Sequence, residues 1–157
     1  MKSILMLITA LLVASQAAAG SLAPREGWVV HDTGKPYNAL IDSLKAAVKA
    51  NGMIVVTQAG PTGAAKRRGI TIPGNRVLGV FNNKFAVRTI RLSVAAMIEA
   101  PIRFYVTEDA DGTATLSYKL PSHVFAPYYD EGGEDLKALA AELDGIFADI
   151  SLGAVGG

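Results

Sequence analysis

The sequence contains no cysteine, and this absence removes several classes of protein from consideration. Without thiols the chain can form no disulfide framework, offers no thiolate nucleophile and builds no cysteine-ligated zinc site. A lipid anchor on a processed N-terminal cysteine is excluded for the same reason. A stable fold must therefore come from hydrophobic packing, which half of the residues can supply.

Long apolar runs are also scarce, and the one that stands out lies at the N-terminus. Lys2 precedes the apolar residues 4–13, and Ala17, Ala18 and Ala19 follow, which is the pattern of a cleavable signal peptide. The run is shorter than the roughly 20 residues that span a bilayer. We predict a periplasmic or secreted protein, cut after Ala19 and not inserted in a membrane afterwards. An uncleaved amphipathic tail is the alternative.

The rest of the chain has the size of one ordinary domain. We divide it into an N-terminal lead of residues 20–27, one folded domain of residues 27–150, and a tail of residues 151–157. The tail, SLGAVGG, is small and glycine-rich and is expected to be flexible.

Neither sign of charge dominates, since the formal net charge is +1, so the balance predicts no preference for nucleic acid or membrane. The distribution is uneven, because basic residues gather between positions 66 and 103 and acidic residues between 108 and 149. This pattern indicates either an anion-binding face or two halves that neutralise each other, within one fold or across a dimer.

Hydrophobic periodicity and turn residues predict the elements of the first half. Asn82 is the expected N-cap of a helix that begins at Lys84 and ends before Pro101. The other predicted elements are a short strand at 28–31, a turn at 32–36, a helix at 37–51, a buried strand at 53–57, a helical turn at 64–68 and a strand at 76–81.

The second half contains the strongest local signal, Asp111-Gly112, which predicts a hairpin between strands at 102–108 and 113–120. A loop at 121–133 then leads to a final amphipathic helix that begins at Glu134. The order of elements predicts an α+β fold, a small antiparallel sheet covered by two or three helices.

The stretch 100–106, APIRFYV, followed by Asp111-Gly112 and Pro121-Ser122, resembles the family called domain of unknown function 302, or DUF302. The segment NNKFA at 82–86 and the closing helix also correspond, so the resemblance covers roughly residues 28–150. It implies a small fold similar to the TATA-binding-protein-like class, often dimeric, and no known reaction. Many relatives carry cysteines where this chain has Phe81 and Ile102, so a thiol or metal role does not transfer.

A group of cations is the first candidate site. Lys84, Arg88 and Arg91 lie at positions i, i+4 and i+7 of a predicted helix and so share one face. Together with Arg103 they are assigned to binding an anion or an acidic partner, because guanidinium groups fit planar anions. A simple solvated helix face is the alternative.

Aromatic residues near the hairpin form the second candidate. Tyr105, Tyr118 and Ser122 are assigned to a possible pocket. Alternation places Tyr105 and Arg103 on one face of their strand. On the next strand it places Lys119 on the face opposite to that of Tyr118. Ordinary core packing is the alternative.

These features predict a non-catalytic ligand-binding or protein-interaction module, a homodimer that takes a small anionic ligand or a protein partner. No catalytic residue, metal, cofactor or nucleic-acid partner is indicated. Two alternatives remain open. One is a periplasmic hydrolase or isomerase with His31 or His123 as general base near a carboxylate such as Asp32. The other is a metal or haem carrier using the histidines with Met53 and Met97.

Overall fold

The structure, a computed structural model, describes residues 22–156. The predicted signal peptide of residues 1–19 and its cleavage site lie outside this part of the chain. In order, the elements are β1 (Trp28–Pro36), α1 (Tyr37–Ala50), β2 (Ile54–Ala59), α2 (Thr62–Arg67), β3 (Asn75–Phe81), α3 (Asn83–Leu92), the 3-10 helix η1 (Ala95–Glu99), β4 (Ile102–Glu108), β5 (Thr113–Lys119), α4 (Pro121–Phe125), the 3-10 helix η2 (Ala126–Tyr128) and α5 (Tyr129–Gly156).

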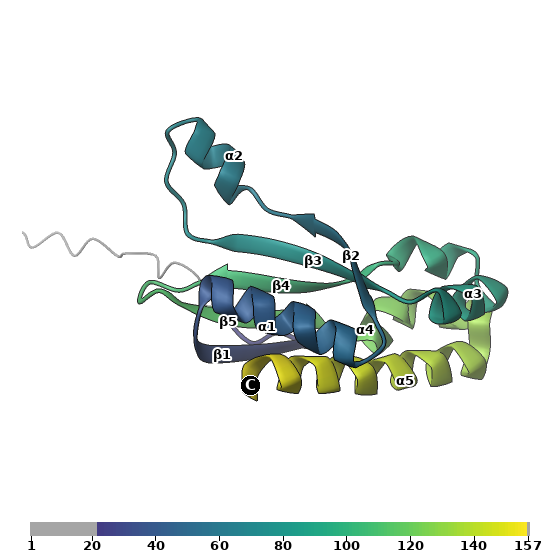
Figure 1. Cartoon of the computed structure of the whole chain (residues 1–157). Helices are drawn as coiled ribbons and strands as arrows, with labels where there is room; N and C mark the ends of the chain where they lie inside the picture. The colour runs from purple at the N-terminus through teal and green to yellow at the C-terminus, as the bar shows by residue number, and fades with distance from the viewer. Residues whose placement is uncertain (1–21, 157) are drawn as a thin grey trace, which may run out of the picture.

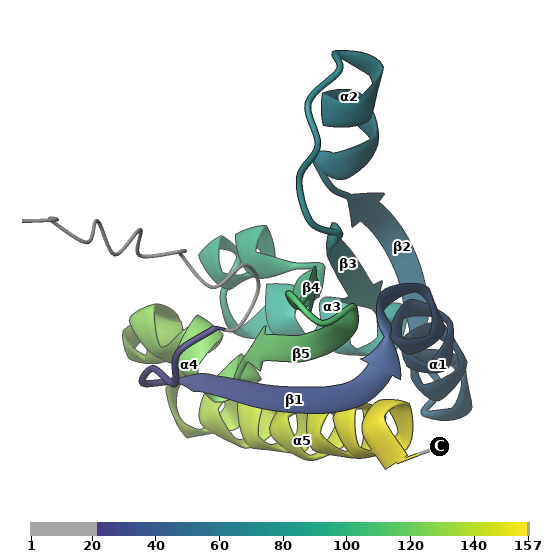
Figure 2. The same cartoon turned by 90° about the vertical axis from the view of Figure 1, so that its left-hand side faces the viewer.

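The strands form one sheet of five in the order β1-β5-β4-β3-β2, and every neighbouring pair is antiparallel. Helices α1 and α5 lie against one side of this sheet (Figure 1, Figure 2). The predicted α+β class is therefore confirmed. Because side chains alternate along a strand, every second residue is directed to the helices and the others to the opposite, open face.

Stacked aromatic rings join α5 to the centre of the sheet. The rings of Phe104 on β4 and Phe147 on α5 are 4.8 Å apart between centroids and nearly parallel, at 8°. The Tyr118 ring on β5 lies 4.9 Å from Phe104 and 5.8 Å from Phe147. All three side chains are 2% exposed or less. Each such pair adds about 0.5–1.5 kcal/mol beyond the area that it buries.

Several local predictions are confirmed. Helix α1 buries the predicted face, and Gly52 follows its C-cap with a φ of 69°. The side chain of Asn82 accepts a hydrogen bond from the Lys84 amide at 2.8 Å and so caps α3. The hairpin joins β4 to β5, and Gly112 takes a φ of 84° in its turn.

The strand predicted at 53–57 exists, but the prediction that it is buried is wrong. The strand exists as β2, but β2 is the edge of the sheet, with Ile54 61% and Val56 48% exposed. At the other edge, the predicted turn at 32–36 is part of β1, which runs to Pro36. An edge strand tolerates Gly34 and Pro36 because it pairs on one side only.

The predicted loop at 121–133 is also wrong, because α4, η2 and the first turn of α5 occupy it. Pro121 stands at the first turn of α4, where its missing amide has no intrahelical acceptor. Gly133, with φ 58° and ψ −151°, interrupts α5, so a continuous helical stretch begins at Glu134 as predicted. Hydrophobic periodicity does not predict these short helices, because they have too few turns to show a repeat of apolar residues.

The tail at 151–157 was expected to be flexible, but α5 continues to Gly156 and buries Ser151 and Ala154. The Lys35 ammonium donates a hydrogen bond to the Ala154 carbonyl at 2.8 Å. A cation at the C-terminus of a helix can hydrogen-bond to the last carbonyls of the helix and interacts favourably with the negative end of the helix dipole. A contact with a distant part of the chain therefore orders this segment.

Residues 60–74, called the arm, leave the sheet between β2 and β3 and carry α2 away from the rest of the molecule (Figure 1, Figure 2). Across the described residues, no helix combines the length and the apolar character that crossing a membrane requires.

The aromatic contact predicts a large effect of Phe147→Ala on stability. Removing a fully buried ring that stacks on Phe104 is expected to lower the free energy of unfolding by about 3–5 kcal/mol. Urea denaturation followed by circular dichroism measures it. Ile98→Ala, at a side chain that is 79% exposed, is the control and is expected to change stability by less than about 0.5 kcal/mol. Equal effects of the two variants would contradict the assigned core.

Candidate functional site

The open face of the sheet carries its side chains in rows that run across the strands. Strand register places Trp28 opposite Lys119 and Gly79 opposite Arg103. The β4–β5 register pairs Phe104 with Tyr118, so extending it by one residue places Arg103 beside Lys119. The row is therefore Trp28, Lys119, Arg103 and Gly79, from β1 to β3.

Two further rows follow along the same face. The middle row contains Val30, Ser117, Tyr105 and Val77. The last row contains Asp32, Thr115, Thr107 and Asn75. The face thus changes from cationic and aromatic at one end to polar and acidic at the other.

The two cations of the first row stand side by side without a carboxylate partner. Neither Arg103 nor Lys119 forms an ion pair with any residue of the described part of the chain. The Lys119 ammonium lies 5.6 Å from the centroid of the Trp28 ring, and the Arg25 guanidinium lies 5.2 Å from it. Both contacts are within cation–π range. Like charges on neighbouring strands are unfavourable, so this row carries a local energetic cost.

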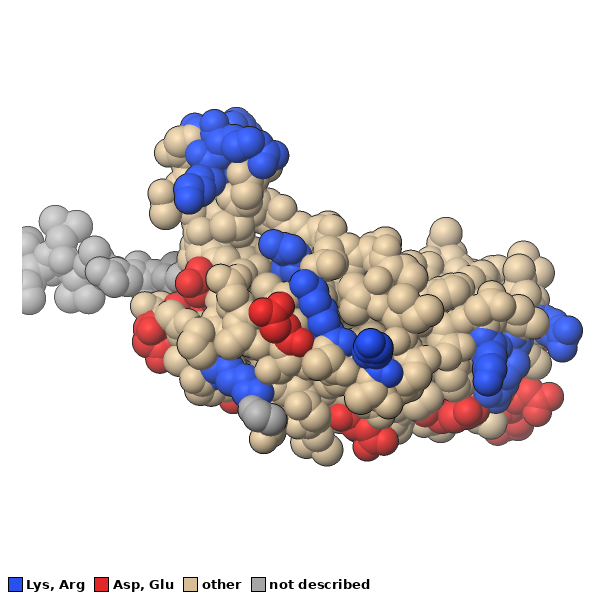
Figure 3. All heavy atoms as spheres, in the orientation of Figure 1, with Lys and Arg blue, Asp and Glu red and all other residues tan. Residues whose placement is uncertain are grey.

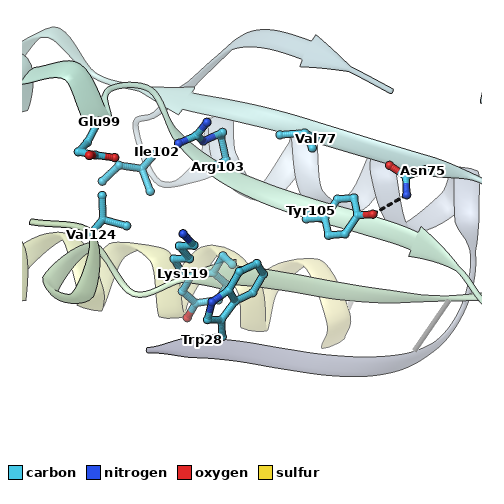
Figure 4. A pocket seen from close by; sticks show the side chains of 10 residues that line it. Trp28, Asn75, Val77, Glu99, Ile102, Arg103, Tyr105, Lys119 and Val124 are labelled. Atoms are coloured by element: carbon cyan, nitrogen blue, oxygen red, sulfur yellow. Dashed lines mark hydrogen bonds between the residues drawn. The ribbon is translucent and has the colours of Figure 1, made fainter. Parts of the chain in front are cut away.

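An open cavity of about 410 Å³ lies over this row and the middle row (Figure 4). Its volume is within the range of small-molecule sites. Figure 4 shows side chains entering it from the strands, from η1 and from α4. The lining residues are Trp28, Asn75, Val77, Glu99, Ile102, Arg103, Tyr105, Tyr118, Lys119 and Val124.

One end of the cavity is bordered by a polar pair from neighbouring strands. The Asn75 side-chain amide donates to the Tyr105 hydroxyl, as the dashed line in Figure 4 shows. Both residues are half-buried. Each is held in place by the other, so they present a fixed hydroxyl and amide to the cavity.

The cavity is bordered at its other end by η1, which carries Glu99. The Tyr128 hydroxyl of η2 donates to the Glu99 carboxylate at 2.7 Å. This hydrogen bond, with burial and the charge of Glu99, raises the pKa of the Tyr128 phenol above its ordinary value. The bond ties η1 to η2 and engages the one carboxylate among the lining residues.

The acidic end of the face lies outside the cavity. The Thr115 hydroxyl is 3.1 Å from the Asp32 carboxylate and 2.9 Å from the Asp109 carboxylate. The Asp111 carboxylate accepts from the Thr113 amide at 3.0 Å within the hairpin turn. These carboxylates form what we call the acidic tip, whereas Glu108 at the end of β4 is directed to the covered side of the sheet.

The predicted cation site is divided between two places. Arg103 lies on the open face, whereas Lys84, Arg88 and Arg91 lie on α3, which packs beside α5 on the covered side. Arg88 forms an ion pair with Glu142 at 2.7 Å, and Arg91 borders a groove with Asp135. The anion-binding role of α3 stays a prediction, and Arg103 lies apart from that helix.

The predicted aromatic pocket is divided as well. Tyr105 lies on the open face beside Arg103, as alternation predicted. Tyr118 is 2% exposed and belongs to the core, although it is also among the residues that line the cavity. Ser122 is part of α4 and does not line the cavity, but Val124 of the same helix does.

His31 and Asp32 do not form the general-base pair that one alternative hypothesis names. His31 is directed to the core face and Asp32 to the open face, because they are consecutive in β1. The Nε2 atom of His31 is buried and has no partner among residues 22–156. Within the same residues, no three histidines or carboxylates lie together as metal ligands would. Met53 is buried in the core.

The predicted site did not include the lining residues Trp28, Asn75, Val77, Glu99, Ile102, Lys119 and Val124. Alternation along β4 predicted that Arg103 and Tyr105 share one face, and the register set by the Asp111-Gly112 turn brings Lys119 to the same face. Trp28 joins them through the pairing of β1 with β5, and no turn links those two strands directly.

Comparisons with known proteins agree with the fold. The model of the family described as "Domain of unknown function DUF302" matches residues 29–150. A crystal structure of an uncharacterized conserved DUF302 protein from Bacillus stearothermophilus superimposes with a TM-score of 0.70 at 20% identity. The match covers 80% of this chain and 96% of that one. No curated protein matches.

The bond between Tyr128 and Glu99 predicts a spectroscopic change. Glu99→Gln removes the charge that disfavours phenolate formation, so the pKa of Tyr128 is expected to fall toward its ordinary value. Ultraviolet titration at alkaline pH, compared with Tyr128→Phe, isolates this phenol. Glu134→Gln, at an exposed carboxylate on α5, is the control. An unchanged titration of Glu99→Gln would show that the bond does not form in solution.

Proposed function

We propose that this chain, which belongs to the DUF302 family, is a ligand-binding module that holds a small anionic molecule on the open face of its sheet. The observation that carries the proposal is the adjacent pair Arg103 and Lys119, which border a cavity and lack an ion-pair partner among residues 22–156. An anion between them removes the repulsion and gains charge-assisted hydrogen bonds.

The walls of the cavity favour a ligand with an apolar body. Trp28, Val77, Ile102 and Val124 supply hydrophobic surface around the cations. An aliphatic or aromatic carboxylate fits this arrangement, since its head reaches Arg103 and Lys119 while its body covers the apolar side chains. The Asn75–Tyr105 pair can then bind a polar group at the far end of the ligand.

Binding without covalent chemistry is part of the proposal. The Glu99 carboxylate accepts a hydrogen bond from the Tyr128 hydroxyl, and both cations are suited to bind an anion rather than to transfer protons. The local cost of like charges on neighbouring strands is the kind of departure from folding rules that functional sites show.

The proposal includes export, which rests on the signal-peptide pattern of residues 1–19. The intact mass of the protein recovered from outside the cytoplasm of the expressing cells is expected to correspond to a chain that begins at Gly20. A mass that still includes Met1 to Ala19, or recovery from the cytoplasm alone, would contradict export while leaving the binding site untouched.

Trp28 provides a direct assay, because it is the only tryptophan of the chain and it lines the cavity. Octanoate is the probe, and its binding is expected to change Trp28 emission in a saturable manner. Arg103→Gln and Lys119→Gln are each expected to raise the Kd for octanoate by about tenfold to a hundredfold, the range of a lost charge-assisted hydrogen bond.

Two controls separate this site from general hydrophobic binding. Octanol has the same apolar body without the charge and is expected to bind more weakly than octanoate. Lys84→Gln removes an exposed cation on α3 and is expected to leave the Kd unchanged. Equal affinity for octanol and octanoate, or a loss of binding in Lys84→Gln alone, would overturn the proposed site.

A further inference from the structure

The arm, residues 60–74, belongs to a long stretch of sequence without carboxylates. Between Asp42 and Glu99 the chain contains no aspartate or glutamate. The arm itself carries three consecutive cations, Lys66, Arg67 and Arg68, and all three are exposed. Neither ion pair found among residues 22–156 involves them. Figure 3 shows basic side chains, and no acidic ones, over α2 on the face in view. The chain therefore does not neutralise the charge of its own arm.

Projection of the arm isolates this charge from the rest of the molecule. No residue from 60 to 73 is buried, and α2 is held away from the sheet and from the long helices (Figure 1, Figure 2). At physiological salt, exposed charges more than about 8 Å apart are largely screened from each other. The arm can therefore act as a local positive surface, although the formal net charge of the whole chain is only +1.

Local hydrogen bonds give the end of the arm a defined shape. The Gly69 amide bonds to the Lys66 carbonyl and the Ile70 amide to the Ala65 carbonyl, each at 3.0 Å. These are the two bonds of a Schellman motif, and Gly69 has the positive φ of 74° that the motif favours. The motif turns the chain so that Ile70 comes back to the last turn of α2, which carries the cations.

The turn also leaves an apolar side chain in water next to the cations. Ile70 is 46% exposed, and no residue of the described chain covers it. Val56, on the strand that leads into the arm, is 48% exposed. Exposed apolar groups beside lysine and arginine are typical of surfaces that bind to a bilayer, where cations meet lipid phosphates and apolar groups reach the acyl boundary.

We infer that the arm binds the headgroup surface of an anionic phospholipid bilayer. Guanidinium groups form charge-assisted hydrogen bonds with phosphate oxygens, and two of the three cations are arginines. Each cation near such a surface strengthens binding by about fivefold. The contact is peripheral, because one isoleucine adds only a shallow apolar anchor. This inference goes beyond the proposed function and does not depend on it.

Two other kinds of partner fit the arm less well. Residues 60–74 contain no aromatic side chain on which a base of a single-stranded nucleic acid could stack. Each side of a stable protein interface contributes roughly 20–30 residues, and the whole arm is shorter than that. A lipid surface needs no matching shape, so a small projecting cluster of cations is sufficient to bind it.

Sedimentation with lipid vesicles tests the inference. The protein is the chain of residues 20–157, which omits the apolar N-terminal run and keeps every described residue. We expect saturable binding to vesicles of phosphatidylglycerol and phosphatidylcholine in equal parts, weakened by added sodium chloride, and little binding to phosphatidylcholine alone. Arg67→Gln with Arg68→Gln is expected to raise the Kd by roughly twentyfold to thirtyfold. Ile70→Ser is expected to raise it by about fivefold.

Matched controls separate the arm from other cations. Lys49→Gln with Lys84→Gln makes the same change of charge on α1 and α3 and is expected to alter the Kd by less than about twofold. Arg103→Gln, which weakens octanoate binding in the proposed site, is expected to leave vesicle binding unchanged, because no arm residue lines the cavity. Circular dichroism verifies the fold of each variant. If the double arm variant fails to fold, Lys66→Gln alone replaces it, with an expected fivefold effect.

Absence of vesicle binding by the parent chain would overturn the inference, and so would equal binding to phosphatidylcholine alone. An equal loss in the α1 and α3 control would show that net charge, and not the arm, is responsible. Displacement from vesicles by inorganic phosphate, beyond that by sodium chloride of equal ionic strength, would assign the arm to a small free anion instead. Binding to DNA that the arm variant loses, without any binding to vesicles, would assign it to nucleic acid.

Discussion

The structure depends on a sheet that is covered by long helices on one face. Packing of α1 and α5 around Phe104, Tyr118 and Phe147 fixes which side of every strand is buried. Since side chains alternate, the same packing determines which residues are left for the open face. Phe104 faces the core, so its two neighbours in β4, Arg103 and Tyr105, face outward. The position of the site therefore follows from the packing of the core.

The two faces of the sheet differ in role, since the covered face stabilises the fold and the open face carries the candidate site. The covered face supplies the stability that lets the open face keep Arg103 next to Lys119, an arrangement of like charges that has an energetic cost. The short elements η1 and α4 border the cavity that lies over the cations. The arm and the acidic tip lie at one end of the sheet, and none of their residues lines the cavity.

Local sequence signals predicted the fold well where neighbours in the chain decide the structure. The Asp111-Gly112 turn, the Asn82 cap and the buried face of α1 are of this kind. The errors arose where distant contacts decide. Ile54 lies on an edge rather than in the core because of strand order, and the C-terminal segment is helical because Lys35 and α1 hold it. For the site, alternation identified Arg103 and Tyr105, but Trp28 required the pairing of β1 with β5.

We propose that the open face, and not the basic helix α3, binds the anion. Backbone amide chemical shifts recorded by NMR during titration with octanoate distinguish the two surfaces. The largest shifts are expected at Trp28, Arg103, Tyr105 and Lys119 and are expected to saturate together with one Kd. Shifts confined to Lys84, Arg88 and Arg91, with the open face unchanged, would contradict it.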